Sequence, residues 1–317
     1  MASTEGKRGT PRLTISPPLL NSASPWATTA DNLRELLQCP HTGAVTTRTS
    51  ILDEAGFDHQ PSKHRYQFFD PITGQIHSKG SADGPLPSSH WDVPSDASKA
   101  GSINSLGYSP LSLSKYLDIL TALSVEMPHV TKTVIISVTG TAEEVRKSYD
   151  KIVAWEGTVT FKIAMEINLS CPNIEGKPPP AYGSPEEYVR ALPTESQIPV
   201  GLKVAPFAYA EQVEVFLNGV DERISFVTAV NTLGGCVVGD IAGGMAGVGL
   251  HPLAVGNVKM LRKGLDARGL EIDIIGIGGV CDKDGFERMK SAGAMAVAVG
   301  TALGRWGVGI FGKIGKN

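Results

Sequence analysis

The fold follows from Thr133-Val-Ile-Ile-Ser-Val138, from residues 142–154, and from Phe161-Lys-Ile-Ala-Met-Glu-Ile-Asn-Leu169. The first and last of these stretches are short and almost continuously apolar, as strands buried on both faces are. The middle stretch places Val145 and Ile152 among Glu, Lys and Arg residues, as an amphipathic helix does. A strand, a helix and a second parallel strand are therefore the predicted building unit.

The same alternation continues along most of the chain. Further strands are predicted at residues 13–21, 43–47, 200–204, 224–230, 272–276 and 294–299. Further helices are predicted at residues 31–37, 185–192, 210–218, 252–265 and 283–292, with a final turn near 308–314. About eight strand–helix units in 317 residues favour an α/β fold, a single (β/α)8 TIM barrel, over a doubly wound sheet. We expect residues 1–12 to form an N-terminal tail and residues 13–317 to form the barrel.

Residues 53–99 interrupt this alternation. They are rich in Ser, Pro, His, Asp and Gly and show neither helical nor strand periodicity. A long segment of this kind inside a compact domain is usually a functional loop or a disordered one. We therefore expect a long loop insertion after the second strand, lying over the mouth of the barrel, with disorder as the alternative.

Composition and charge exclude several classes of protein. Apolar residues make up 41% of the chain and charged residues 19%, as in an ordinary soluble globular protein. The 29 Lys and Arg residues against 32 Asp and Glu residues give a net charge of -3, so neither nucleic acid nor an anionic membrane is expected as a partner. The long uncharged stretch of residues 241–258 is broken by glycines and Pro252, which favours a loop and a helix start over a membrane span. Because the first residues lack an apolar signal region, we expect a cytoplasmic protein.

The four cysteines, Cys39, Cys171, Cys236 and Cys281, lie far apart and form no Cys-x-x-Cys pair. Their spacing indicates neither a zinc site nor a disulfide framework. We therefore predict no metal and four free thiols.

Two glycine-rich loops end the last two predicted strands. They are Ile275-Gly-Ile-Gly-Gly-Val280 and Val299-Gly-Thr301. In a barrel these loops follow strands seven and eight, where backbone N–H groups and a helix N-terminus commonly bind a phosphate. The sequence therefore predicts a phosphate site, and the alternative is that the glycines only make tight turns.

The most unusual string is Glu166-Ile-Asn-Leu-Ser-Cys-Pro-Asn173, at the end of the fourth predicted strand. A lone cysteine is more often an inert apolar residue, but Cys171 lies between amides at the mouth of a barrel, where catalytic residues lie. Amide side chains both donate and accept hydrogen bonds, which suits a planar heterocycle with alternating C=O and N–H groups. Asn104 and Asn231 add two more amides at other loop starts.

Lys203, in Gly201-Leu-Lys-Val-Ala205, is a cation inside an otherwise apolar strand. Burying an unpaired ammonium group is costly, so Lys203 either reaches solvent or faces an electron-rich partner. A flavin ring that becomes anionic on reduction would be such a partner.

These strings resemble dihydroorotate dehydrogenases, specifically the soluble class that uses a cysteine base. The matching motifs are Ile103-Asn-Ser-Leu-Gly107, Asn168-Leu-Ser-Cys-Pro-Asn173, Gly201-Leu-Lys203, Val230-Asn-Thr232, Gly276-Ile-Gly-Gly279 and Gly300-Thr-Ala-Leu303. The resemblance extends from about Leu13 to the C-terminus, outside residues 53–99. It implies an FMN-containing TIM barrel that oxidises dihydroorotate to orotate in pyrimidine biosynthesis. It also implies a cytosolic homodimer that uses fumarate as its electron acceptor.

The resemblance assigns roles to individual residues. Cys171 would remove the C5 proton of dihydroorotate while the C6 hydride passes to FMN, and Lys203 would stabilise the reduced flavin. The implied substrate-binding residues are Asn104, Leu106, Gly107, Asn168, Asn173, Asn231 and Thr232. The implied FMN-binding residues are Ser22, Ala23, Arg48, Thr49, Asn168, Lys203, Val230, Gly247, Gly278, Gly279, Gly300 and Thr301.

The sequence departs from the family at Arg48, where relatives usually have a lysine, and the guanidinium group is larger and planar. The stretch between Asn231 and Gly247 is also shorter than in the family, near the usual dimer contact. Two alternatives stay open: another FMN barrel that acts on a dihydropyrimidine, and a diverged relative that binds FMN or a pyrimidine with little turnover. Enzymes of the first kind carry iron–sulfur cysteine clusters that this sequence lacks.

Overall fold

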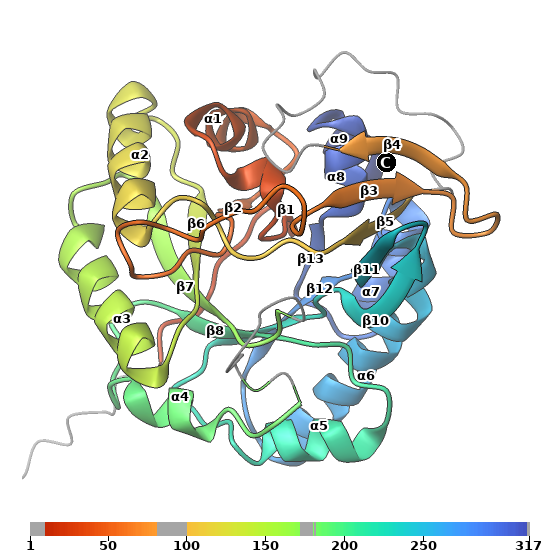
Figure 1. Ribbon diagram of the computed structural model, residues 1–317. Helices are drawn as coiled ribbons and strands as arrows, with labels where there is room; N and C mark the ends of the chain where they lie inside the picture. Colours follow the sequence, from red (N-terminus) through yellow and green to blue (C-terminus); the bar gives the residue numbers. More distant parts are fainter. Residues whose placement is uncertain (1–9, 81–99, 172–179, 181, 316–317) are drawn as a thin grey trace, which may run out of the picture.

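The computed structural model describes residues 10–80, 100–171, 180 and 182–315, and their central element is a closed barrel of parallel strands (Figure 1). The strands follow one another around the barrel in the order β1-β13-β12-β9-β8-β7-β6-β2. They are β1 (Leu19–Asn21), β2 (Ala44–Thr46), β6 (Thr133–Val138), β7 (Lys162–Asn168), β8 (Val200–Val204), β9 (Phe226–Ala229), β12 (Asp273–Ile277) and β13 (Ala296–Val299). The predicted α/β fold, a (β/α)8 TIM barrel, is confirmed.

Helices surround the barrel and connect its strands. In the described ranges they are α1 (Ala30–Gln38), α2 (Leu113–Glu126), α3 (Ala142–Glu156), α4 (Glu186–Ala191), α5 (Ala210–Leu217), α6 (His251–Ala267), α7 (Lys283–Ser291), α8 (Thr301–Trp306) and α9 (Gly309–Gly315), with the 3-10 turns η1 (Pro25–Ala27) and η3 (Val248–Leu250). Neither α2 nor α8 was predicted from the sequence. None of the helices that the structure describes has both the length and the apolar character that a membrane crossing requires.

Local chemistry explains where predicted elements begin. α3 starts with a capping box, because the Thr141 hydroxyl accepts from the Glu144 N–H and the Glu144 carboxylate accepts from the Thr141 N–H. The first barrel strand was predicted over residues 13–21, but β1 begins only at Leu19. Pro17 and Pro18 have no N–H group to donate, so the ladder of hydrogen bonds starts after them.

The prediction of a loop for residues 53–99 is wrong for part of the segment. Its described residues include β3 (Tyr66–Phe69) and β4 (Ile76–Gly80), an antiparallel pair that extends a strand outside the insertion, β5 (Gly101–Asn104). On the other side of β5 lies the hairpin of β10 (Leu233–Val238) and β11 (Ile241–Gly247). The result is a five-stranded sheet in the order β10-β11-β5-β3-β4.

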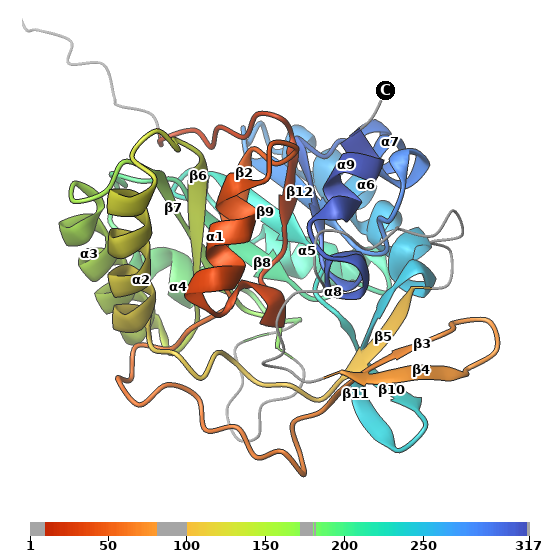
Figure 2. The ribbon, with the colours of Figure 1, turned by 90° about the horizontal axis from the view of Figure 1, so that it is seen from above.

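The hairpin of β10 and β11 corrects a second prediction, because residues 241–247 were expected to form a loop. Their many glycines are typical of a loop, but here they allow the β11 backbone to pair closely with the neighbouring strand. A Cβ atom at Gly243 would overlap the Asn104 carbonyl, and one at Gly247 would overlap the Ala100 carbonyl. Figure 2 shows the five-stranded sheet beside the end of the barrel at which the carboxyl ends of the strands lie.

The barrel interior is packed with side chains. Its apolar residues include Leu20, Ala44, Ile135 and Phe226, all 1% exposed or less, so the barrel is a core and not a pore. Phe226 is the bulkiest of them, and Gly201 on the neighbouring strand leaves room for its ring. A ligand can therefore enter only at an end of the barrel.

The packing between α8 and η1 can be tested by a substitution at Gly304. A Cβ atom at Gly304 would overlap the indole ring of Trp26, so Gly304→Ala should lower the free energy of unfolding by roughly 1–3 kcal/mol, as overpacking does. Gly256→Ala in α6 is the matched control, because outside the neighbouring backbone of its own helix no atom lies within 4 Å of the added Cβ. It should be neutral or stabilising by up to about 1 kcal/mol. Urea denaturation of both variants measures the difference, and equal stabilities would contradict the packing described here.

Candidate functional site

A cavity lies at the carboxyl ends of the barrel strands, next to the five-stranded sheet. It spans about 940 Å³ of space, a figure that includes open solvent. Cofactors and small substrates bind in concave sites of this kind. Since the barrel interior is filled, this mouth is the natural place for a ligand.

The structure brings together every predicted site residue that it describes. They all line this cavity: Ser22, Ala23, Arg48, Thr49, Asn104, Leu106, Gly107, Asn168, Cys171, Lys203, Val230, Asn231, Thr232, Gly247, Gly278, Gly279, Gly300 and Thr301. Asn173, predicted to bind substrate, lies outside the described residues. Residues far apart in sequence thus share one wall because the barrel closes.

Of the Arg, Lys, Asp and Glu side chains, only the cations occur in the described lining of the cavity. Arg48 and Lys203 are each only 4% exposed, and none of the described lining residues is an Asp or a Glu. Burial lowers the pKa of Lys203, while the charges of Glu166 and Cys171 act in the opposite direction. Two buried cations without a lining carboxylate favour an anionic ligand.

Strand β7 carries polar side chains into the barrel at alternate positions. Glu166 and Asn168 are two residues apart and face the interior, as the period of a strand requires, and Asn168 is in register with Lys203 of β8. The Ser137 hydroxyl donates to Glu166 at 2.9 Å and lies 2.9 Å from the Thr49 hydroxyl. The Asn168 amide donates to Thr49 at 3.0 Å. These hydrogen-bonded side chains form the polar base of the cavity, which we call its floor.

The amides predicted to hold the substrate are themselves held in place. The side-chain Oδ1 of Asn168 accepts from the Ser170 hydroxyl at 3.0 Å, and the Asn231 amide donates to the same hydroxyl at 3.0 Å. The Asn104 amide donates to the Gly244 carbonyl of β11 at 3.2 Å. The five-stranded sheet therefore orients one of the amides, and the barrel orients the others.

The glycine loops meet at one end of the cavity. A second, much smaller hollow shares Gly247, Gly279, Gly300 and Thr301 with the first. Gly279 has a φ of +68°, and a Cβ atom there would lie 2.6 Å from the Gly247 carbonyl oxygen, so only glycine fits. The backbone can thus approach a ligand closely where the sequence predicted a phosphate.

His251 forms a hydrogen bond with the glycine loop at Gly278. Its Nδ1 donates to the Gly278 carbonyl at 2.7 Å, and its Nε2 accepts from the Arg288 Nε at 2.9 Å. These partners define a neutral ring with its proton on Nδ1. Burial lowers the pKa of His251, and the Arg288 charge acts in the same direction.

Nine further lining residues were not predicted from the sequence, among them Trp26, Tyr66, Ser102 and Tyr108. The Tyr66 and Trp26 rings meet edge to face at 5.1 Å, and burial raises the pKa of the Tyr66 phenol. The Ser102 hydroxyl lies 2.8 Å from that of Thr301. The aromatic run Tyr66-Gln-Phe-Phe69 has high strand propensity, and it was the one available signal for β3.

The described residues contain no group of three or more His, Cys, Asp or Glu side chains that could hold a metal ion. Within the same ranges Cys39, Cys171, Cys236 and Cys281 form no disulfide bond.

His251 should make stability depend on pH. Its folded-state pKa is depressed, so the unfolded chain binds the proton more readily, and stability is lost as the pH falls below about 6.5, the ordinary histidine value. Urea midpoints measured between about pH 7.5 and 5.5 should fall more steeply for the parent protein than for His251→Gln. The control is His129→Gln, a change at an exposed histidine outside the loop. Parallel curves for the parent protein and His251→Gln would contradict this assignment.

Comparison with known proteins agrees with the geometry of the cavity. The family model described as "Dihydroorotate dehydrogenase" matches residues 92–317. A protein of Streptococcus uberis named "Putative dihydroorotate dehydrogenase A (fumarate)" is 33% identical over 233 residues, which cover 68% of this chain and 70% of that protein. Proteins of the same name from Streptococcus equi (32% identity, 68% and 71% covered) and Streptococcus pyogenes (34% identity, 69% and 72% covered) are similarly related. The chain therefore belongs to the dihydroorotate dehydrogenase family.

Proposed function

We propose that this protein oxidises dihydroorotate to orotate in pyrimidine biosynthesis, with FMN as its cofactor. The family membership supports the reaction. The observation that carries it is the single cavity in which Cys171, the amides of Asn104, Asn168 and Asn231, and the cation Lys203 meet.

The residues of the cavity fit FMN. The loops at Gly247, Gly279 and Gly300 offer backbone N–H groups to a phosphate where side chains have no room. The flat walls of Trp26 and Tyr66 suit the apolar part of a cofactor. Ser22, Ala23, Arg48, Thr49, Asn168, Lys203, Val230, Gly278 and Thr301 would complete the binding site.

The reaction removes a proton from C5 of dihydroorotate and a hydride from C6. FMN, when bound, accepts the hydride. Cys171 lies half-buried at the cavity wall and would take the proton as a thiolate, after which it releases the proton to solvent. Asn104, Asn168 and Asn231 would hold the pyrimidine edge, with Leu106, Gly107, Asn173 and Thr232 as the remaining substrate contacts. The two cations favour the negative charge of the substrate carboxylate.

We also propose fumarate as the electron acceptor. The names of the streptococcal relatives carry this assignment, and fumarate is a dianion that suits a cavity lined by Arg48 and Lys203. The homodimer, the cytoplasmic location and the domain boundaries at residues 12 and 13 stay predictions.

Anaerobic reduction tests the function directly. Purified protein should be yellow and contain FMN in preference to riboflavin, and dihydroorotate should bleach it in the absence of oxygen. Fumarate should then restore the colour. A yellow protein that dihydroorotate does not bleach would favour a diverged relative that binds FMN with little turnover.

Cys171 is the residue on which the chemistry depends most. Cys171→Ala should slow bleaching by roughly 10²–10⁴ while the FMN content stays unchanged, because the thiolate serves proton transfer alone. Cys171→Ser should exceed Cys171→Ala only at high pH, where a hydroxyl begins to share the role. Stopped-flow absorbance measures both, and Cys236→Ala in β10, outside the cavity, is the control. Bleaching of Cys171→Ala at the parent rate would rule out the thiolate as the base.

A further inference from the structure

The segment of residues 51–64, which precedes β3, lies against the loop that follows β5. The Leu113 N–H donates to the Ile51 carbonyl at 3.0 Å, and the Phe57 N–H donates to the Ser109 carbonyl at 2.9 Å. A Cβ atom at Gly107 would overlap the Phe57 ring, so the two stretches are in close contact. The segment is therefore anchored beside the cavity by backbone and ring contacts.

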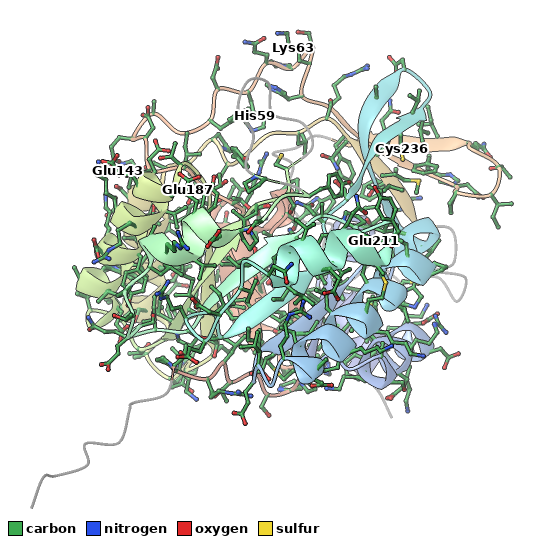
Figure 3. All side chains as sticks on the ribbon, turned by 90° about the horizontal axis from the view of Figure 1, so that it is seen from below. His59, Lys63, Glu143, Glu187, Glu211 and Cys236 are labelled. Carbon is green, nitrogen blue, oxygen red and sulfur yellow. The ribbon has the colours of Figure 1, made fainter. Side chains whose placement is uncertain are left out.

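This segment places His59 next to Arg48. Figure 3 shows His59 on the side of the segment that faces the barrel, with Lys63 at its outer edge. The His59 Nε2 lies 3.1 Å from the Arg48 Nη2, which is also 3.5 Å from the Gly107 carbonyl oxygen. The His59 ring packs edge to face on Phe57 at 5.1 Å and on His64 at 5.3 Å. The imidazole thus connects a packed cluster of rings to a buried guanidinium in the cavity wall.

The same nitrogen has a second neighbour, the Tyr108 carbonyl oxygen at 2.7 Å. Arginine N–H groups only donate and carbonyl oxygens only accept. The His59 Nε2 can therefore accept from Arg48 or donate to the Tyr108 carbonyl, but it cannot do both at once. Acceptance from Arg48 requires a neutral ring with its proton on Nδ1. A glutamine at this position offers an oxygen and an NH₂ group, which could serve both neighbours together.

We propose that His59 is a positioning residue for the substrate: it holds the Arg48 guanidinium at the cavity wall, where the guanidinium meets an anionic carboxylate. The inference rests on the proposed function, since it takes the anion to be dihydroorotate or orotate. A planar guanidinium binds a carboxylate well only in a defined orientation, and a flexible one loses binding energy to ordering. Both Arg48 and His59 lie outside residues 92–317, which the family model matches.

The test is calorimetric titration of the FMN-loaded holoenzyme with orotate at about pH 8, where a histidine ring is neutral. His59→Phe keeps a ring on Phe57 and removes the nitrogen, and it should raise the orotate Kd about tenfold, the effect of one weakened charge-assisted hydrogen bond. The KM for dihydroorotate should rise similarly while kcat changes little. FMN content and the thermal midpoint should stay near those of the parent protein.

His64→Phe is the matched control. It is the same substitution in the neighbouring ring, which packs on His59 and accepts from the Gln60 N–H at 2.8 Å. It should leave the orotate Kd unchanged. His59→Gln should restore most of the affinity. In an Arg48→Lys background, which lacks the nitrogen that contacts His59, His59→Phe should change the Kd less than about twofold.

Each contrary result overturns the proposal in a distinct way. An unchanged or tighter Kd in His59→Phe would mean that His59 does not hold Arg48 for the ligand. Equal losses in His59→Phe and His64→Phe, or the full loss in the Arg48→Lys background, would assign the effect to packing of the segment. A parent holoenzyme that binds no orotate would overturn the proposed function and the role of His59 with it.

Discussion

Closure of the parallel sheet is the constraint on which the rest of the structure depends. β1 pairs with β13 on one side, with Leu19 opposite Val297, and with β2 on the other side. Because all eight strands run in one direction, closure collects their carboxyl ends on one rim. Residues from opposite ends of the sequence then touch, and a Cβ atom at Gly300 would lie 2.9 Å from the Ser22 hydroxyl oxygen. The cavity exists because closure of the barrel brings these distant residues together.

Because the barrel interior is filled with side chains, water screens the charges at that rim only weakly. Arg48 and Lys203 lie in the cavity wall with little solvent around them, so screening by water is weak and their effect on an anion is strong. A carboxylate, Glu166, lies in the floor and not in the lining, bound by the Ser137 hydroxyl. Its charge helps to offset the cost of the buried ammonium without placing a negative group in contact with an anionic ligand.

The five-stranded sheet adds a wall that the barrel alone lacks. Its central strand, β5, carries Ser102 and Asn104 into the cavity, while β3 brings Tyr66. Insertions at the carboxyl ends of barrel strands leave the core untouched, and this is where such folds vary their ligands. In this chain the segment before β3 also places the His59 imidazole next to Arg48.

The amino-acid sequence by itself determined the alternation of strands and helices, and with it the barrel. Each strand and helix shows its buried face in a local apolar pattern, so no distant contact is needed to recognise it. It also determined the site residues that lie at strand ends, such as Asn168, Lys203 and Gly278, because parallel strands in a barrel present their carboxyl ends together.

Only the tertiary structure decided the five-stranded sheet and the residues that it brings to the cavity. β11 is rich in glycine because it must approach β5 closely, and that composition is the opposite of what a strand shows locally. β3 and β4 lie within a polar segment without periodicity, and their backbone groups pair with one another and with β5. Pairing between distant strands leaves little local signal, so Tyr66 and His59 became visible as parts of one site only when the chain was folded.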